Sequence, residues 1–382
     1  MSPRAPPAAS KPSLSLRMKS SMIMGITGLL GRSFLYGFNK VEATGLSRFI
    51  ELLDSRQDPE KRQRGLLTVS NHVSVLDDPA VWGLLPLSYA FNPNNLRWTL
   101  GAHDICFKNK FFASFFTAGQ VLPCHRAKHS QFAGLHQPAM TQAIRLLSSP
   151  SVTASSPETY TTTGTDSIPS PLTHPLYRKH SWVHVFPEGL VHQHPDVDLR
   201  YFKWGVARLI LEADPVPDIL PMFIDGTQRV MPEDRGFPRF LPRIGKTIRV
   251  SFGEVLDYDA VFGDLKHKWD ALVARETKKQ QKGRFFGLLG NSAQTKTQEV
   301  EDTQQQVGEL TSEELRYGKE ATEIRIEVAR RMREEVLKVR RKLGGYKESD
   351  PSFAFAETWS PDKVEAANKY KSRVDGSNIA QD

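Results

Sequence analysis

Short apolar runs alternate with helical patterns through the middle of the chain. From Asp196 to Ala213, apolar residues recur at the spacing of a helix that buries one face. Runs rich in β-branched and aromatic residues predict strands at 66–69, 182–186, 219–224 and 247–252, with a shorter strand-like run at 121–123. Because strands and helices alternate, the pattern predicts an α/β fold whose sheet contains parallel strands.

The same pattern predicts one folded domain over residues 41–262. Residues 148–175 interrupt this domain with a segment composed mainly of Ser, Thr and Pro. Such a segment offers little apolar surface to offset the entropy that is lost on ordering. We therefore expect residues 148–175 to form a disordered insertion in a surface loop.

Charged sequence follows the domain. We expect residues 263–309 to form a charged linker, in which RFFGLL at 284–289 is either plain linker or a membrane-contacting patch. Residues 310–345 predict a charged helix, because apolar residues recur every three or four positions and form one stripe. That stripe, which we expect to pack on the core, consists of Ile324, Val328, Met332, Val336, Val339 and Leu343. Residues 346–382 predict a weakly ordered tail.

Residues 1–40 form a basic N-terminal segment, since no Asp or Glu precedes Glu42. An acid-free basic start is compatible with mitochondrial targeting and equally with an ordinary disordered tail. The apolar stretch that begins at Met22 meets Arg32 after about ten residues, whereas a bilayer span needs about 20. We therefore expect residues 22–38 to lie in a membrane interface or to pack on the core, rather than to cross a bilayer.

The net charge restricts the kinds of partner, and the cysteine content restricts the kinds of disulfide or metal site. The 382 residues carry a formal net charge of +8, which favours nucleic acid or acidic phospholipid. The basic residues are not interleaved with aromatic residues in an RNA-binding pattern, so we expect no nucleic-acid partner. Two cysteines are too few for a disulfide scaffold or a Cys-based zinc site. His192 and His194 beside Asp196 lack a third well-spaced ligand, and we predict neither a metal nor a cofactor.

The stretch NHVSVLDDP places His72 five positions before Asp77. On one continuous helix these side chains would point roughly 140° apart, so contact between them requires a turn. A predicted strand precedes the stretch, and Asp78 and Pro79 suit the N-cap and the first position of a helix. Because ligands bind at the carboxyl ends of parallel strands, a loop here can join the carboxylate to the imidazole at a binding site.

A histidine–carboxylate pair is suited to general-base catalysis. The carboxylate orients the ring, fixes its tautomer and stabilises the imidazolium that forms when the other nitrogen takes a proton. The alternative is that Asp77 only caps a helix and that His72 is a partly buried polar residue. The spacing alone leaves both interpretations open.

The stretch WVHVFPEG ends a predicted buried strand with Phe186, Pro187, Glu188 and Gly189. The proline ends the strand ladder and the glycine permits a tight turn. Glu188 is thereby held at the carboxyl end of a strand, which is also where His72 lies. The alternative is a simple turn with a solvated glutamate.

Two more stretches are candidates for a binding site. In FFTAGQVLPCHR, Gly119 breaks an aromatic run and Arg126 follows a strand-like segment. Arg126 either grips a phosphate through a forked, charge-assisted contact or lies on the surface. In DILPMFIDG, Pro221 begins an apolar strand before a glycine turn, which favours a core role over the wall of a pocket.

Together, NHVSVLD, GQVLPCHR, FPEG and LPMFIDG resemble, in order and spacing, the four motifs of the glycerolipid acyltransferase family. A single H-x-x-x-x-D is weak evidence, but four motifs in the right order are specific. The resemblance implies a mixed, partly parallel sheet flanked by helices, with an N-terminal interfacial membrane segment. It also implies that the chain is an acyltransferase.

The resemblance assigns roles to motif residues. His72 is expected to be the general base, and Asp77 to orient its ring. Arg126 is expected to hold a phosphate, and Glu188 to position glycerol hydroxyls or that arginine. Backbone N–H groups near Gly189 are candidates for an oxyanion hole. The other motif residues expected to contact substrate are Gly119, Phe186, Pro187, Gly189 and Pro221.

Longer stretches resemble the family members that exchange acyl chains between phospholipids and remodel cardiolipin in mitochondria. These stretches are NHVSVLDDPAVWGLL, AHDICFKNKFFASFFTAGQVLPCHR, WVHVFPEGLV and RYFKWGVARLILEA. This likeness implies transfer without coenzyme A, with cardiolipin, monolyso-cardiolipin and phosphatidylcholine as partners. It also implies peripheral or monotopic association with the outer and inner mitochondrial membranes, facing the intermembrane space. The insertion and the long C-terminal part depart from the shorter animal-type members and suggest a fungal-type elaboration.

Two other functions stay open. The motifs serve acyl-CoA donors equally well, so the first alternative is an acyl-CoA-dependent lysophospholipid acyltransferase. The second is a non-catalytic protein that binds anionic membranes, which the presence of all four motifs disfavours. The sequence leaves the acyl-chain preference and the choice between monomer and oligomer open.

Overall fold

The computed structural model describes residues 14–149, 159–171, 179–290, 306–359, 369–371 and 378–380. At its centre lies a seven-stranded sheet in the order β1-β9-β8-β2-β7-β3-β4. The strands from β8 to β4 are mutually parallel, β9 is antiparallel to β8, and β1 is parallel to β9. The strands of this sheet are β1 (Lys40–Thr44), β2 (Leu66–Ser70), β3 (Trp98–Ala102), β4 (Val121–Cys124), β7 (Trp182–Val185), β8 (Asp218–Asp225) and β9 (Thr247–Phe252).

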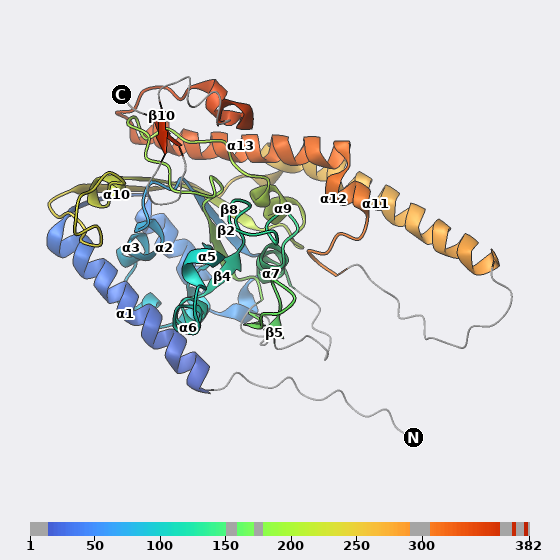
Figure 1. Cartoon of the computed structure of the whole chain (residues 1–382), viewed down its shortest axis with the longest axis horizontal. Helices are drawn as coiled ribbons and strands as arrows, with labels where there is room; N and C mark the ends of the chain where they lie inside the picture. The colour runs from blue at the N-terminus through green and yellow to red at the C-terminus, as the bar shows by residue number, and fades with distance from the viewer. Residues whose placement is uncertain are drawn as a thin grey trace.

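Helices flank this sheet, with α1 along one side of the molecule and α13 along the other (Figure 1). The longer helices are α1 (Leu14–Phe38), α2 (Leu46–Ser55), α6 (Lys110–Ala118), α7 (Pro138–Leu147), α9 (Gly205–Leu211), α11 (Tyr258–Gly290) and α13 (Lys319–Leu343). The short ones are α3 (Asp77–Val81), α4 (Leu87–Ala90), α5 (His103–Cys106), α10 (Thr227–Val230) and α12 (Glu313–Tyr317). The predicted mixed, partly parallel sheet flanked by helices is confirmed.

The minor elements lie outside the central layers. Two-stranded sheets are formed by β5 (Thr159–Tyr160) with β6 (Ile168–Pro169), and by β10 (Lys369–Lys371) with β11 (Asn378–Ala380). The 3₁₀ turns are η1 (Pro59–Lys61), η2 (Trp82–Leu84), η3 (Pro93–Asn95), η4 (Pro351–Ala354) and η5 (Ala356–Trp359).

The five predicted strand segments are all strands, with ends that agree to within one residue. The pattern did not predict β1 and β3. Strand β1 is the sheet's edge, and its mixed, half-exposed sequence KVEAT lacks the apolar run of a buried strand. Strand β3 contains Gly101, which interrupts its short apolar run.

Helix α1 packs on the core by one face and exposes the other. A Cβ added to Gly28 would lie 2.7 Å from the Ala90 side chain, so only glycine permits this close approach to α4. The opposite face carries an apolar stripe whose side chains are 46–64% exposed: Met18, Met22, Ile26, Leu29 and Leu30. Among the described residues, no helix combines the length and apolarity that a membrane span requires.

The middle of the Ser/Thr/Pro insertion is ordered. Between β5 and β6, the Asp166 carboxylate accepts hydrogen bonds from the hydroxyl and backbone groups of three successive threonines and closes the turn. The buried Thr162 hydroxyl also lies 2.9 Å from Nε2 of His125. The prediction of disorder is therefore wrong for residues 159–171, because local polar contacts replace an apolar core. The rest of the insertion lies outside the described residues.

The first part of the predicted charged linker is helical. The prediction that a linker begins at residue 263 is wrong, since α11 continues to Gly290. Its buried residues recur every three or four positions and pack near α13: Phe262, Leu265, Trp269 and Leu272. The high content of charged residues concealed this stripe in the sequence. The side chains of RFFGLL lie outside the described part of the chain.

The C-terminal region also differs from expectation. The predicted helix is present as α12 and α13, separated at Gly318. After α13, the Tyr346 hydroxyl donates to Asp225 at 3.0 Å, and Trp359 is only 6% exposed. The prediction of a weakly ordered tail is therefore wrong for residues 346–359, because aromatic side chains anchor them to the domain.

The helix predicted from Asp196 to Ala213 is much shorter than expected, since α9 begins only at Gly205. The backbone carbonyls before α9 have other partners. Arg340 donates to the carbonyls of Asp196 and Val197, and Arg333 donates to those of Leu199 and Arg200. In the loop at 196–204, arginine side chains rather than helical N–H groups therefore satisfy these four carbonyls.

Replacing Trp269 by alanine tests the packing of α11. Trp269 is 2% exposed, and the Arg325 guanidinium lies 5.0 Å from its ring centroid. Loss of a buried tryptophan should lower the free energy of unfolding by about 3–5 kcal/mol, measured by urea denaturation. The exposed neighbour Lys268 provides the control, because Lys268→Ala should change stability by about 0.5 kcal/mol or less. Equal effects of the two substitutions would contradict a packed helix.

Candidate active site

The sequence motifs lie side by side at the carboxyl ends of the parallel strands. Because β8, β2, β7, β3 and β4 are parallel, their carboxyl ends meet there in that order. The residues that follow these ends include Thr227 after β8, His72 after β2, Glu188 after β7, Asp104 after β3 and Arg126 after β4. This is the edge at which ligands bind to open α/β sheets.

His72 and Asp77 are in direct contact. The loop after β2 turns back, so that Nδ1 of His72 lies 2.9 Å from Oδ2 of Asp77. The Asp77 side chain has no solvent exposure, and the His72 side chain is 20% exposed. With Nδ1 held by the carboxylate, Nε2 is the nitrogen without a hydrogen-bond partner among the described residues. An imidazole held in this way can accept a proton at Nε2.

Asp77 has three further hydrogen-bond donors. The backbone N–H groups of Val73 and Ser74 donate to Oδ2 at 2.7 and 2.8 Å. The Thr227 hydroxyl donates to Oδ1 at 2.5 Å. These bonds satisfy a buried carboxylate that would otherwise be costly to ionise. The sequence motifs do not include Thr227. The feature that could have identified it as a site residue is its position directly after the DILPMFIDG stretch.

Asp78 and Pro79 do not have the predicted positions in the helix. Helix α3 begins at Asp77, and its N-cap is Leu76 without a side-chain hydrogen bond. The Asp78 carboxylate instead accepts Nε of Arg97 at 2.9 Å and the indole N–H of Trp82 at 3.1 Å. The capping prediction is therefore wrong. The Asp78 carboxylate forms an ion pair with Arg97, which directly precedes β3, instead of capping the helix.

Phe186 and Glu188 lie next to His72. The Phe186 ring stacks on the imidazole with centroids 4.3 Å apart, which restricts the tilt of the imidazole. The Glu188 carboxylate accepts the backbone N–H of His72 at 2.9 Å and that of Arg200 at 3.2 Å. Glu188 is 2% exposed, and burial raises its pKa to about 7. Glu188 joins the loop after β2 to the loop at 196–204, and the alternative of a solvated glutamate is excluded.

The FPEG turn holds Glu188 in place. Gly189 has a φ of +66°, a conformation that favours glycine. Its N–H donates to the carbonyl of Phe186 at 3.0 Å, and the carbonyl of Pro187 accepts the N–H of Lys203 at 2.8 Å. The Gly189 N–H is thus part of the turn, and an oxyanion hole formed by backbone N–H groups near Gly189 stays a prediction.

Arg126 lies at the same edge but away from His72. Three strand spacings of about 4.8 Å separate the ends of β2 and β4, which is roughly 14 Å. Asp104 pairs with the guanidinium, at 3.1 Å between Nε and Oδ1, and this contact lowers the pKa of the Asp104 carboxyl. The pair borders a cavity of about 220 Å³ that is also lined by His103, His125, His129 and Thr163. Arginine and histidine side chains are groups that can bind an anion.

Gly119 and Pro221 have structural positions. Gly119 ends α6, and its carbonyl accepts a hydrogen bond from Arg97 at 3.1 Å. Pro221 lies inside β8 opposite Val69 of β2, one residue before the pairing with β9 begins. Its carbonyl accepts the N–H of Gly253, directly after β9, at 2.8 Å. Neither residue contacts His72 among the described interactions, so the structure does not bring them into the immediate site.

The C-terminal helix holds the loop that contacts Glu188. The buried Arg333 donates to the carbonyls of Leu199 and Arg200 at 2.6 and 3.0 Å. The buried Arg340 donates to carbonyls at the start of the same loop. Because the Arg200 N–H donates to Glu188, α13 supports the site through one intermediate residue. The sequence did not predict this link, since a charged helix is normally solvated.

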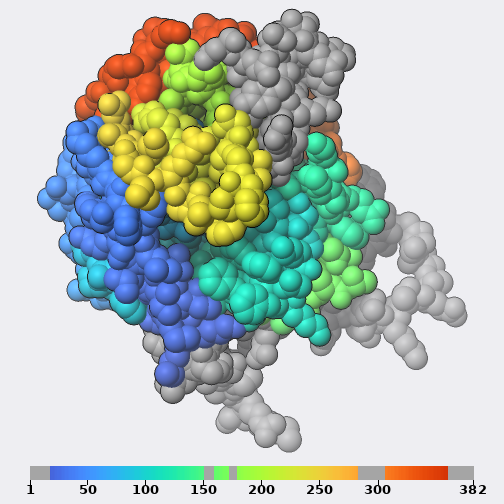
Figure 2. Space-filling view, turned by 60° about the vertical axis from the view of Figure 1, so that its left-hand side comes forward, coloured from blue at the N-terminus to red at the C-terminus, as the bar shows by residue number. Residues whose placement is uncertain are grey.

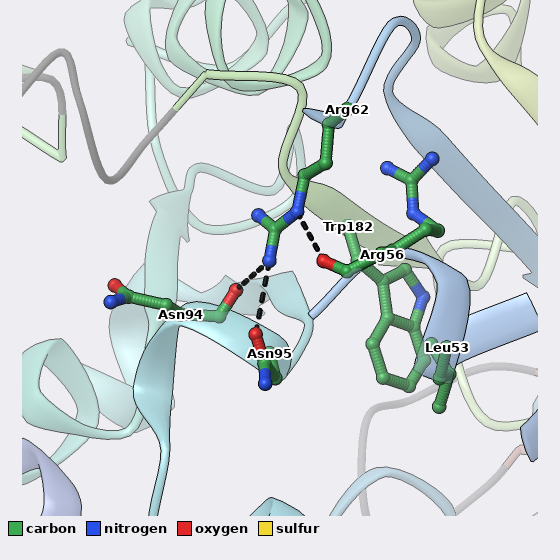
Figure 3. Close-up of a pocket in the computed structure, with 6 residues that line it drawn as sticks. All are labelled: Leu53, Arg56, Arg62, Asn94, Asn95 and Trp182. Atoms are coloured by element: carbon green, nitrogen blue, oxygen red, sulfur yellow. Dashed lines mark hydrogen bonds between the residues drawn. The ribbon is translucent and has the colours of Figure 1, made fainter. Parts of the chain in front are cut away.

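Among the residues that the structure describes, the amino ends of the strands border a much smaller cavity than the one beside Arg126. A cavity of about 10 Å³ lies there, next to Leu53 and to Trp182 at the start of β7 (Figure 3). The Arg62 guanidinium points across it and donates to Asn94 and Asn95. Its third contact is the carbonyl of Arg56. This small cavity is closed by arginine–backbone contacts and has no room for a substrate.

Comparisons with known proteins show which proteins this chain is similar to. A family model described as Acyltransferase matches residues 51–225. The Tafazzin of Saccharomyces cerevisiae is 35% identical over 85% of this chain and 76% of its own. The Tafazzin of Drosophila melanogaster is 32% identical over 69% of this chain and 58% of its own. The crystal structure of the 1-acyl-sn-glycerophosphate acyltransferase of Thermotoga maritima, 15% identical, covers 72% of this chain and 81% of its own with a TM-score of 0.36.

The raised pKa of Glu188 predicts a pH-dependent stability. Burial raises this pKa from 4.5 to about 7, so the folded state holds the proton more tightly than the unfolded chain. Stability should therefore fall as the pH rises from about 4.5 through about 7, by up to about 3 kcal/mol, and stay level above that. In urea titrations, the free energy of unfolding of the wild type minus that of Glu188→Gln should fall by this amount over the same pH range. A difference independent of pH would contradict the raised pKa.

Replacing Arg333 by methionine tests the support from α13. The change keeps the apolar stem of the side chain but removes two hydrogen bonds to the loop at 196–204. Backbone amide hydrogen exchange in that loop should become at least about tenfold faster, while exchange in β2 stays unchanged. Arg330→Met is the control on the same helix, because the Arg330 side chain is 50% exposed and pairs with Glu327, one turn away on α13. Unchanged exchange at residue 200 would contradict the proposed support.

Proposed function

The chain belongs to the tafazzin family of acyltransferases, and on that premise we propose that it transfers acyl groups directly between phospholipids and lysophospholipids. The observation that carries the proposal is the contact between His72 and Asp77, with Nε2 of the imidazole left to accept a proton. Within that reaction, we propose remodelling of cardiolipin, with phosphatidylcholine as donor and monolyso-cardiolipin as acceptor.

The proposed mechanism begins at Nε2 of His72. A lysophospholipid hydroxyl gives its proton to Nε2 as its oxygen attacks the acyl ester carbonyl of a donor phospholipid. Asp77 holds Nδ1–H and stabilises the imidazolium that forms. The imidazolium then returns the proton to the departing lysolipid oxygen when the tetrahedral intermediate collapses. No covalent acyl-enzyme is required.

Other residues have supporting roles in this mechanism. The Arg126 cavity at the same sheet edge supports the proposal that this guanidinium, together with nearby histidines, holds a phosphate. Asp104 would then share the arginine with the ligand. Glu188 acts by holding the backbone of His72, and Phe186 by restricting its ring. Both are positioning residues in this scheme.

The proposed donor is a phospholipid and not a thioester. Exchange of one ester for another is close to thermoneutral, so the chemistry needs neither ATP nor coenzyme A. The motif residues serve an acyl-CoA-dependent lysophospholipid acyltransferase equally well, and this is the second candidate. The family membership favours the phospholipid donor.

We propose further that the protein associates with membranes from one side, through the apolar stripe on α1. Side chains that are apolar, exposed and aligned along a helix suit insertion at the interface between headgroups and acyl chains. Residence on the outer and inner mitochondrial membranes, facing the intermembrane space, belongs to the same proposal. Phospholipid substrates and a basic chain are consistent with it.

Acyl transfer in liposomes tests the proposed function. Purified protein is mixed with labelled phosphatidylcholine and monolyso-cardiolipin without coenzyme A, and the label is followed into cardiolipin. We expect transfer by the wild type, and a rate for His72→Ala that is lower by about 10²–10⁴, as is typical when a general base is lost.

Two results would contradict this proposal. Transfer that begins only after addition of acyl-CoA would assign the chain to the thioester-dependent enzymes. Undiminished transfer by His72→Ala would overturn the mechanism. His267→Ala provides the control for loss of a histidine, because His267 is exposed on α11.

A further inference from the structure

One loop near the site exposes large apolar side chains. The apolar loop, residues 235–246, has the sequence RGFPRFLPRIGK and connects α10 to β9. Phe237 is 96% exposed, Phe240 74%, Leu241 55% and Ile244 60%. A monomeric soluble surface rarely gathers so many large apolar side chains on one short segment. The loop therefore requires an occupant that covers them.

The conformation of the apolar loop is fixed by its own arginines. The Arg235 guanidinium donates to the carbonyls of Pro232 and Arg239. The Arg239 guanidinium donates in return to the carbonyls of Glu233 and Arg235. These bonds satisfy backbone carbonyls inside the loop, and they leave the phenylalanine rings outside. The exposure of the rings is thus built into a defined turn.

The apolar loop begins at the active site. It follows β8 and α10, whose Thr227 donates to Asp77. Gln193 also bridges the two regions, because its amide N–H₂ donates to the carbonyls of Val73 and Met231 and its oxygen accepts the N–H of Glu233. The base of the loop is therefore bonded to the loop that carries His72.

The apolar loop ends at helix α1. The Gly245 N–H donates to the carbonyl of Phe38 at 2.8 Å, and the Lys246 N–H donates to Asn39 at 3.0 Å. Figure 2 shows the loop, in yellow, against α1, in blue, on one face of the molecule. Phe38 and Tyr36 at this end of α1 are themselves 57% and 50% exposed. The loop thus extends the apolar stripe of α1 toward the active site.

Charge indicates what covers this surface. The apolar loop contains Arg235, Arg239, Arg243 and Lys246 and no acidic residue. Arg243 is exposed between the apolar tips Leu241 and Ile244. Apolar side chains for the acyl region, interleaved with cations for the headgroups, match an anionic phospholipid bilayer. A protein partner would not need such alternation along a single loop.

We propose that the apolar loop is a second membrane-inserting element, which docks on anionic phospholipid bilayers together with α1 and brings the His72 loop to the bilayer surface. The proposal deepens the proposed function, since it names the surface from which the site would take its lipids. With two adjacent anchors that meet at residues 38–39 and 245–246, the orientation of the site toward the bilayer is fixed.

Vesicle sedimentation tests the apolar loop. The full chain is mixed with vesicles of phosphatidylcholine containing cardiolipin, and the bound fraction of Phe237→Ser/Phe240→Ser is compared with that of the wild type. The double variant should bind at least tenfold more weakly. Ile326→Ser on α13 is the control, because Ile326 is 44% exposed and lies on another element, and it should change binding by less than twofold. Equal binding of the double variant and the wild type would overturn the proposal.

A charge reversal gives a second, independent readout. Arg243→Glu should weaken binding to cardiolipin-containing vesicles at least fivefold at low salt, and should have little effect in vesicles of phosphatidylcholine alone. Loss of binding to both kinds of vesicle alike would contradict the role assigned to this charge. Thermal unfolding of every variant checks that the fold is intact. Binding does not require turnover, so an absence of acyl transfer would contradict the proposed function and leave this test valid.

Discussion

The geometry of the site depends on a carboxylate that is completely withdrawn from water. Removing an ion from water costs several kcal/mol unless partners replace the lost hydration. Asp77 is surrounded by four donors: one imidazole, two backbone N–H groups of its own loop, and the Thr227 hydroxyl. Because these donors come from the ends of both β2 and β8, the carboxylate is stable only when the two strands are paired. The orientation of His72 is thus a property of the assembled sheet.

Local signals in the sequence were enough to predict five of the seven strands of the central sheet, and the turn that contact between His72 and Asp77 requires. The apolar runs fixed the strand positions to within one residue, and the turn between His72 and Asp77 followed from helical geometry and the neighbouring strand. Thr227 could not be predicted in the same way, because it lies 150 residues from Asp77 and no periodicity links the two. The same holds for Glu188, whose oxygens accept two backbone N–H groups from different loops. Backbone partners leave no trace in side-chain patterns.

Buried arginines explain most of the remaining errors. Composition assigns arginine to solvent or to anionic partners, yet Arg333 and Arg340 are 4% and 1% exposed and donate to backbone carbonyls. Each guanidinium offers five N–H donors, so one side chain satisfies several carbonyls of a loop that would otherwise need helical bonds. Arginine side chains thus replace helical N–H groups as donors, so the helix predicted at 196–213 is shorter than expected. Arg340 also donates to the carbonyl of Lys347, which helps to order the segment after α13. Which arginine takes such a position depends on long-range packing, and a single sequence does not reveal that.

The order of features along the sheet edge matches the order of groups in a glycerophospholipid. The antiparallel β9 brings the apolar loop to the edge where β8 ends, and α1 reaches the same place through β1. His72 follows at the end of β2, and the cavity beside Arg126 lies roughly 14 Å further on, three strand spacings away. Apolar chain, ester and phosphate would meet apolar loop, imidazole and guanidinium in sequence. If the apolar loop bears on the bilayer, as we propose, a lipid would enter the site along this edge with only its acyl chains still in the membrane, and His72 would meet the ester before the headgroup had lost its contact with water.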